Sequence, residues 1–188
     1  MRTSRPIRPR TAALTTTEYA VLTVLTVETR HRAVSGYDLL KLVEKSVGYI
    51  WTPTKSHLYA VLPRLVQRGL ATQRSAPAVR GPDRQLYRVT MKGERLTRMW
   101  LEEPVPGDSQ LFMLKTFYGG LQSRDSLVAH YRQYVADRQE YLDVLRAVEL
   151  TNTRTGHDYF HYFLLQLGIQ KTELEIAWAE NAIAELER

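Results

Sequence analysis

Apolar residues recur at intervals of three and four in three stretches of residues 14–103, the pattern of helices that bury one face. The first helix follows a capping box formed by Thr15 and Glu18. The second is predicted over residues 35–48, and the third over residues 53–69. This part of the chain is therefore expected to contain three amphipathic helices.

Turn-forming residues mark the end of the third helix and the tip of a hairpin. Gly69 is placed to end that helix as a C′ residue. Residues 70–75 and 85–89 are then predicted as two strands around a basic, turn-rich tip at 76–84, and a further helix begins near Thr90. Three helices followed by a hairpin with a basic tip is the order of a winged helix-turn-helix, and we predict that fold.

The third helix opens with polar residues before its apolar face begins. Pro53 suits the first helical turn, and Thr52 before it can cap the free amides. In a winged domain this is the recognition helix, whose first turn contacts phosphates and base edges in the major groove. The DNA contacts predicted from this helix are Thr54, Lys55, Ser56, His57, Tyr59 and Arg64.

Charge is divided unevenly along the chain. Residues 1–103 carry 18 Lys+Arg against 8 Asp+Glu, and residues 104–188 carry 8 against 12, so net charges of +10 and −4 give the total of +6. A basic module joined to a mildly acidic one is typical of a phosphate-binding domain with a separate non-DNA domain. Further DNA contacts are predicted on the wing and on an N-terminal arm, at Arg80, Arg84, Arg88, Arg5, Arg8 and Arg10.

Residues 104–188 show only helical patterns, with helices expected after Asp108, from Ser123 and from about Asp158. The two longer helices carry apolar residues at alternating intervals of four and three, which lets a seam contact another helix along its length. Such a seam serves either an antiparallel pair within one chain or a dimer. We favour a dimer, because three helices can scarcely bury two stripes alone. The predicted interface comprises Leu165, Ile169, Ile176, Ile183 and Leu186.

The predicted fold is mainly α with a small β-hairpin wing: an N-terminal winged helix-turn-helix and a C-terminal α-helical dimerisation domain. We expect a basic arm at 1–13, the DNA-binding domain at 14–103 and the dimerisation and effector domain at 104–188. With 44% hydrophobic residues, the 188-residue chain can bury a core. It has no cysteine, no apolar run of membrane-spanning length and no apolar leader, so a cytoplasmic protein without a membrane partner is expected.

Several motifs occur along the chain in a specific order and spacing. Around the third helix stands Trp51-x-Pro53-x-x-Ser56-x-Leu58-Tyr59-x-x-Leu62-x-Arg64-Leu65-x-x-x-Gly69-Leu70. The others in this half are Gly36-Tyr37-Asp38-Leu39, and Arg84-x-x-Tyr87-x-Val89-Thr90-x-x-Gly93 followed by Trp100-Leu101. The second half has Leu114-Lys115-x-Phe117-Tyr118, Leu167-Gly168 and Trp178-Ala179-Glu180. Together these motifs resemble the PadR family of transcriptional regulators, the last three the longer C-terminal domain of one branch, and the resemblance covers almost the whole chain.

This resemblance implies a dimeric winged-helix repressor that responds to a small ligand, bound at the dimer interface or between the two domains. A twofold dimer would present two recognition helices to a palindromic operator in double-stranded DNA. Two positions depart from the family pattern: Ser35 stands where histidine is frequent, and Ala60 stands where proline is frequent. Pro63 follows three residues later, and because proline removes a helical hydrogen bond we expect a bend that affects the placement of Arg64.

Aromatic residues are numerous in the second half of the chain. Tyrosine combines flat apolar area with a hydroxyl, which suits a pocket for a small aromatic or amphipathic effector. For each residue, ordinary core or dimer packing is the alternative. The predicted pocket residues are Trp51, Trp100, Tyr118, Tyr131, Tyr134, Tyr159 and Phe163.

Catalytic and metal-binding patterns are weak. His157 and His161 have the spacing of two ligands on a helix face, but no third ligand is identifiable, so no metal site is predicted. No glycine-rich phosphate loop or nucleophile elbow is present, so we expect neither an enzyme nor a cofactor. The alternative to a regulator is a winged-helix interaction module whose basic face binds an acidic protein partner.

Overall fold

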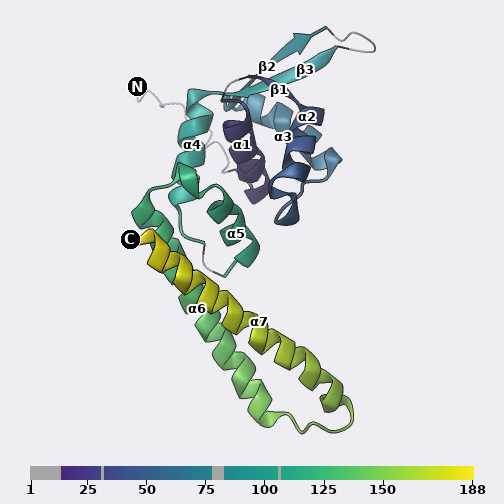
Figure 1. The fold of residues 1–188 in the computed structure, drawn as a ribbon. Helices are drawn as coiled ribbons and strands as arrows, with labels where there is room; N and C mark the ends of the chain where they lie inside the picture. The colour runs from purple at the N-terminus through teal and green to yellow at the C-terminus, as the bar shows by residue number, and fades with distance from the viewer. Residues whose placement is uncertain (1–13, 31, 78–82, 106) are drawn as a thin grey trace, which may run out of the picture. The chain divides into compact units, whose positions relative to one another are not determined.

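The computed structural model describes residues 14–30, 32–77, 83–105 and 107–188 (Figure 1). Among them, the residues up to Val43 and Pro53–Thr97 form one compact unit, and Glu44–Thr52 with Arg98–Arg188 form a second. No helix in these ranges is long and apolar enough to cross a membrane.

The first unit runs helix, strand, two helices, two strands and helix. Its elements are α1 (Thr16–Glu28), β1 (Val34–Ser35), α2 (Gly36–Lys45), α3 (Lys55–Gln67), β2 (Ala71–Ala76), β3 (Arg84–Val89) and α4 (Met91–Glu102). The last residues of α2 and of α4 belong to the second unit. The second helix ends at Lys45 rather than at Gly48, and a short 3-10 helix, η1 (Val47–Tyr49), follows it. With these small differences, the predicted winged helix-turn-helix order is confirmed.

The sheet has three antiparallel strands in the order β1-β3-β2. The two long strands pair from Ala71 opposite Val89 to Ala76 opposite Arg84, as the predicted hairpin requires. No sequence pattern indicated β1, whose two residues pair with Tyr87 and Leu86. The β2–β3 hairpin forms the wing, and its far end extends past β1 (Figure 1).

Local chemistry sets both ends of α3. Its N-cap is Thr54, whose hydroxyl accepts a hydrogen bond from the His57 amide at 3.2 Å. The predicted cap, Thr52, is wrong because its hydroxyl instead donates to the carbonyl of Gly48 at 2.8 Å. At the other end Gly69 has a φ of +68°, as expected of a C′ residue. The helix thus begins two residues later than predicted and ends as predicted.

The core of the first unit joins its helices. The capping box at α1 is present, with the Thr15 amide 2.9 Å from a Glu18 carboxylate oxygen and the Glu18 amide 3.2 Å from the Thr15 hydroxyl. The hydroxyls of Thr26 on α1 and Thr97 on α4 lie 3.1 Å apart in the interior. The largest fully buried apolar side chains are Leu22, Leu25, Leu39, Leu58, Leu62 and Leu65.

The second unit is helical throughout. Its elements are α5 (Ser109–Phe117), the 3-10 helix η2 (Gly119–Leu121), α6 (Arg124–Thr151) and α7 (His157–Leu186). Asp108 caps α5 through the Leu111 amide at 2.9 Å, and Ser123 caps α6 through the Ser126 amide at 3.2 Å. The predicted starts of these two helices, after Asp108 and from Ser123, are therefore confirmed. The long helices α6 and α7 run antiparallel, side by side (Figure 1).

The heptad stripe of α7 packs against the same chain. Ile169 is only 7% exposed, and Ile183 and Leu186 pack on a core cluster that includes Tyr131 of α6 and Phe112 of α5. Leu165 and Ile176, on the same stripe, are half-buried. Part of this stripe is thus used within one chain, and its assignment to an intersubunit surface stays a prediction. A short connection folds the two helices back on each other, so their seams meet within one chain.

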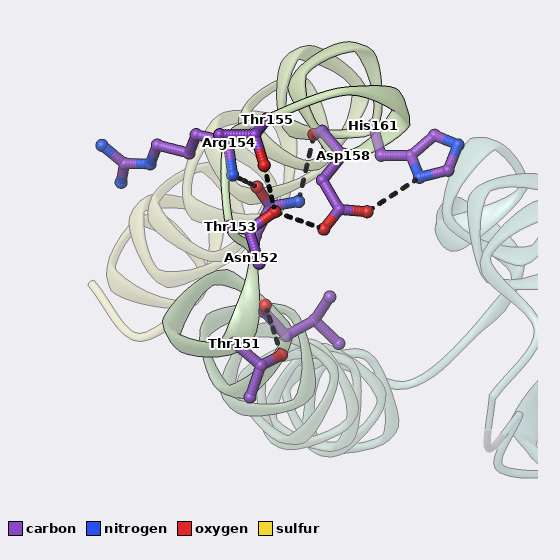
Figure 2. A network of polar contacts seen from close by, with 8 residues as sticks. Thr151, Asn152, Thr153, Arg154, Thr155, Asp158 and His161 are labelled. Carbon is purple, nitrogen blue, oxygen red and sulfur yellow. Dashed lines mark hydrogen bonds and ion pairs between the residues drawn. The ribbon is translucent and has the colours of Figure 1, made fainter.

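Polar contacts within the connection between α6 and α7, and with the start of α7, hold this loop in one conformation (Figure 2). Asn152 accepts from the Arg154 amide at 2.9 Å and donates to the carbonyl of Asp158 at 3.2 Å. The Thr153 hydroxyl donates to the Asp158 carboxylate at 2.7 Å. Nδ1 of His161 lies 3.9 Å from the same carboxylate, which orients this ring toward Asp158 (Figure 2). The loop is therefore a defined turn, with Arg154 at a positive φ of 55°.

Candidate nucleic-acid interface

The first turn of α3 is an exposed row of hydrogen-bonding groups. Thr54, Lys55, Ser56 and His57 are all exposed, whereas Leu58, one residue further, is buried. The later turns of α3 are packed into the core through their apolar face, and its first turn remains exposed. The free amides and the positive end of the helix dipole add to the Lys55 charge. This turn can bind phosphates and hydrogen-bonding base edges.

The wing carries a second set of cations. Arg84 and Arg88 lie on β3 and are exposed, as a phosphate contact requires. Arg88 also donates to the main-chain carbonyl of Arg30 at 3.4 Å. Together with Arg32 and Arg74, it lines a hollow of about 660 Å³ on the sheet. Sequence reasoning missed Arg32 and Arg74, because only the pairing of β1 and β2 with β3 brings them to this surface.

Arg64 is engaged within the first unit. Its guanidinium lies 3.8 Å from the carboxylate of Glu18, and that of Arg68 lies 4.0 Å from the same group. Glu18 is itself buried, at the start of α1. The C-terminal half of α3 therefore places Arg64 beside the capping box, separate from the polar first turn. Four other predicted contacts, Arg5, Arg8, Arg10 and Arg80, lie outside the described residues.

The predicted effector residues fall into separate environments. Tyr131 and Tyr134 are buried against Phe112, whose ring centroid lies 5.1 Å and 4.1 Å from theirs. Burial raises the pKa of both tyrosines. Tyr159 and Phe163 form an exposed edge-to-face pair at 5.1 Å near the start of α7. The remaining predicted residues are Tyr118 and Trp100, both buried, and Trp51, which is half-buried.

A buried cation not predicted from the sequence lies in the second unit. Lys115 is only 2% exposed, and its ammonium group donates to the carbonyls of Trp100 and, at 2.6 Å, of Glu103. Burial lowers its pKa to about 8. The ring of His130 lies close by, with Nε2 3.3 Å from the Glu102 carbonyl, and burial lowers its pKa as well. The two side chains together satisfy carbonyls at the end of α4.

Two protein-family models match the chain, one in each half. Residues 21–98 match the model described as "Transcriptional regulator PadR-like family". Residues 111–187 match the model described as "Virulence activator alpha C-term". The first matched region covers most of the winged unit, and the second covers most of α5 together with α6 and α7.

The chain is also similar over most of its length to a whole protein and to solved structures. The chain is 24% identical over 181 residues to the negative transcriptional regulator PadR of Bacillus subtilis (strain 168), covering 91% of this chain and 97% of that one. The crystal structure of Bacillus subtilis PadR with operator DNA gives a TM-score of 0.42 at 24% identity, over 90% of this chain and 98% of that one. The structure of the same protein with p-coumaric acid gives 0.41 at 23% identity, over 93% and 100%.

Proposed function

We infer that the chain, whose residues 21–98 match the PadR-like family of transcriptional regulators, is a homodimeric repressor that binds a palindromic operator and is released by a small ligand. The observation that carries the inference is the exposed polar first turn of α3 beside an arginine-bearing wing. Lys55 and its neighbours would contact base edges and phosphates in the major groove. Arg84 and Arg88 would follow the backbone from the wing.

A second stripe on α7 supports the homodimer. Large apolar side chains recur there at intervals of four, three, seven and four residues, and the stripe remains exposed: Leu164 is 71%, Leu167 62% and Leu174 70% exposed. Exposed apolar patches of this extent mark interaction surfaces. The full stripe consists of Phe160, Leu164, Leu167, Leu174 and Trp178.

The neighbouring helix α6 also carries exposed apolar residues. They are Tyr141, Val144 and Val148, at intervals of three and four. A second copy of the chain, presenting the same stripes, would cover them in a self-complementary twofold contact. That symmetry would set two recognition helices about 34 Å apart, one turn of DNA, and so favour a palindromic site.

A small aromatic effector is the proposed release signal. Its support is the relative from Bacillus subtilis, which has been crystallised with p-coumaric acid. Tyr131 and Tyr134 are already packed into the core of one chain. The exposed rings of Tyr159 and Phe163 remain open to a ligand or to a partner copy.

Selection of bound genomic fragments tests the proposal. Genomic DNA fragments from the source organism are incubated with the purified protein and sequenced after retention and elution. We expect enrichment of a few fragments that share an inverted repeat with half-sites about one helical turn apart. Sedimentation of the complex should give two chains per fragment. Retention without sequence enrichment, or one chain per site, would contradict the proposed operator recognition.

A further inference from the structure

A hollow of about 430 Å³ lies in the first unit between the start of α2, the middle of α3 and β3. The side chains of Tyr37, Tyr59 and Tyr87 contribute to its lining, together with Arg84 and Gln85. Tyr59 lies one turn after Ser56 on α3, and Arg84 begins β3 of the wing. The hollow therefore adjoins both parts of the candidate nucleic-acid interface.

A glycine shapes the wall of this hollow. A Cβ atom at Gly36, the first residue of α2, would stand 3.1 Å and 3.2 Å from the ring atoms Cε1 and Cζ of Tyr59. That distance is tighter than ordinary van der Waals contact, so glycine allows the Tyr59 ring to approach the first turn of α2. The ring is thereby held beside the hollow rather than directed freely into solvent.

Tyr87 is the most informative lining residue. Its side chain is only 6% exposed and lines the hollow, and no group in the described parts of the chain forms a hydrogen bond with its hydroxyl. Burial raises its pKa, and the neighbouring Tyr59 raises it further, which keeps the hydroxyl protonated and able to donate. The hydroxyl oxygen itself is not enclosed, so it opens to the hollow, where water or a ligand can accept a hydrogen bond from it.

The other polar groups favour an anionic ligand. The Gln85 side-chain oxygen accepts from Gln73 at 2.9 Å, which leaves the Gln85 amide hydrogens to donate. The one carboxylate in the lining, that of Asp83, accepts from the Ser75 hydroxyl at 3.2 Å. The guanidinium of Arg84 adds a positive charge and several donors. Arg84 and Gln85 thus offer donors to the hollow, while Asp83 is engaged by Ser75.

We propose that this hollow seats one phosphodiester group of the bound duplex in each half-site. The Tyr87 hydroxyl and the Arg84 guanidinium donate to the phosphate oxygens, and the rings of Tyr37 and Tyr59 pack against the adjoining deoxyribose. Its position between the first turn of α3 and the wing makes duplex DNA the favoured source of the phosphate over a free anion. This inference rests on the proposed DNA-binding function.

Neutralising the phosphates of a bound duplex one at a time tests whether the hollow binds one of them. A duplex recovered in the genomic selection is synthesised with a single methylphosphonate at each backbone position in turn, and binding is measured for wild type and for Tyr87→Phe. In wild type, one position per half-site should weaken binding about tenfold, the size expected for a hydrogen bond to a charged group. Tyr87→Phe should weaken binding to the unmodified duplex and be less sensitive than wild type to the methylphosphonate at that one position, where Arg84 still meets the charge.

Matched variants separate the possible outcomes. Tyr49→Phe, at an exposed tyrosine of the second unit, should behave as wild type. Arg84→Gln, at an exposed residue, repeats the test should Tyr87→Phe fold poorly. If Tyr87→Phe and Arg84→Gln both respond to the methylphosphonates as wild type does, the hollow does not bind a phosphate of the duplex. The proposed DNA binding would still stand. Failure of wild type to bind any duplex would overturn both proposals.

A free-anion arm distinguishes the source of the phosphate. Inorganic phosphate is added at constant ionic strength to wild type and to Tyr87→Phe. Competition that is stronger for wild type, combined with an unchanged methylphosphonate pattern, would show that the hollow takes a free anion and not the duplex backbone. Equal, weak competition for the two proteins is the result expected for a seat that the duplex fills.

Discussion

The ammonium group of Lys115 donates a hydrogen bond to the main-chain carbonyl of Trp100 and lies 4.7 Å from the centroid of the Trp100 ring. The last carbonyls of a helix lack helical partners, and a lysine that reaches them supplies both a donor and a favourable charge. Here Lys115 comes from α5 and serves the end of α4. The contact explains why a cation tolerates nearly complete burial.

This burial predicts a pH-dependent stability. The pKa of Lys115 is lowered to about 8 in the folded chain, against 10.5 for an ordinary lysine. Between these values the unfolded chain binds more protons, so the free energy of unfolding should rise with pH, by up to about 1.4 kcal/mol per pH unit. Below this window both states are protonated and the cost of burying the charge is fully present.

Urea unfolding of wild type and Lys115→Met, across this pH window, measures the effect. The variant lacks the proton, so the stability of wild type should increase relative to that of Lys115→Met as pH rises. Parallel curves for the two proteins would show that Lys115 keeps its proton in the folded chain, contrary to the prediction.

Local sequence signals predicted most elements because each is decided within a few residues. The Thr15 and Glu18 capping box, the Asp108 cap and Gly69 all act on neighbouring amides or on their own φ angle. The cap of α3 was misplaced because the hydroxyl of Thr52 is taken by a carbonyl in η1, an element the pattern did not indicate.

Features that depend on distant contacts could not be predicted in this way. The strand β1 has two residues and exists only through its pairing with β3. The spacing of Ile183 and Leu186 indicates a helix seam but does not identify the residues they pack on, which include Tyr131 of the same chain. Lys115 gave no signal of a buried role, since a lone lysine is usually exposed. The hollow beside Tyr87 forms from three separate elements.

Gly93 should be essential to the winged unit. A Cβ atom there would stand 2.2 Å from the main-chain oxygen of Leu70 and 2.9 Å from Cγ2 of Val89. The Leu70 oxygen accepts from the Thr90 amide at 3.0 Å, so it cannot move without losing that bond. We expect Gly93→Ala to lower the free energy of unfolding by about 3 kcal/mol or more.

Gly120→Ala is the matched control, because nothing lies within 4 Å of a Cβ atom at that position. Its effect should stay within about 0.5 kcal/mol, as is usual for open surface sites. Chemical unfolding followed by circular dichroism compares the two. Equal stability of both variants would mean that α4 can move away from Leu70 at little cost.

The second stripe of α7 should hold the dimer together. We expect Leu167→Glu to yield monomers, because pairing would bury a carboxylate without a partner at a cost of several kcal/mol. Its helices should remain, since Leu167 is 62% exposed in the single chain. Analytical ultracentrifugation gives the association state, and circular dichroism gives the helix content.

Met99→Glu places the same charge at another exposed apolar residue, on α4, and should remain dimeric. A dimeric Leu167→Glu would place the contact between copies elsewhere. Dissociation of both variants alike would indicate a general effect of added negative charge rather than a specific contact.

Binding of the DNA backbone and bases by the first turn of α3 is best tested through the salt dependence of Lys55→Ala. Binding of wild type, Lys55→Ala and Lys171→Ala to one duplex is titrated over a range of salt concentrations. Lys171 is an exposed lysine on α7 of the second unit and serves as the control. Removing one phosphate contact lowers the slope of log K against log salt by about one. We predict that decrease for Lys55→Ala alone; an unchanged slope for Lys55→Ala, or an equal decrease for Lys171→Ala, would contradict DNA binding by this turn.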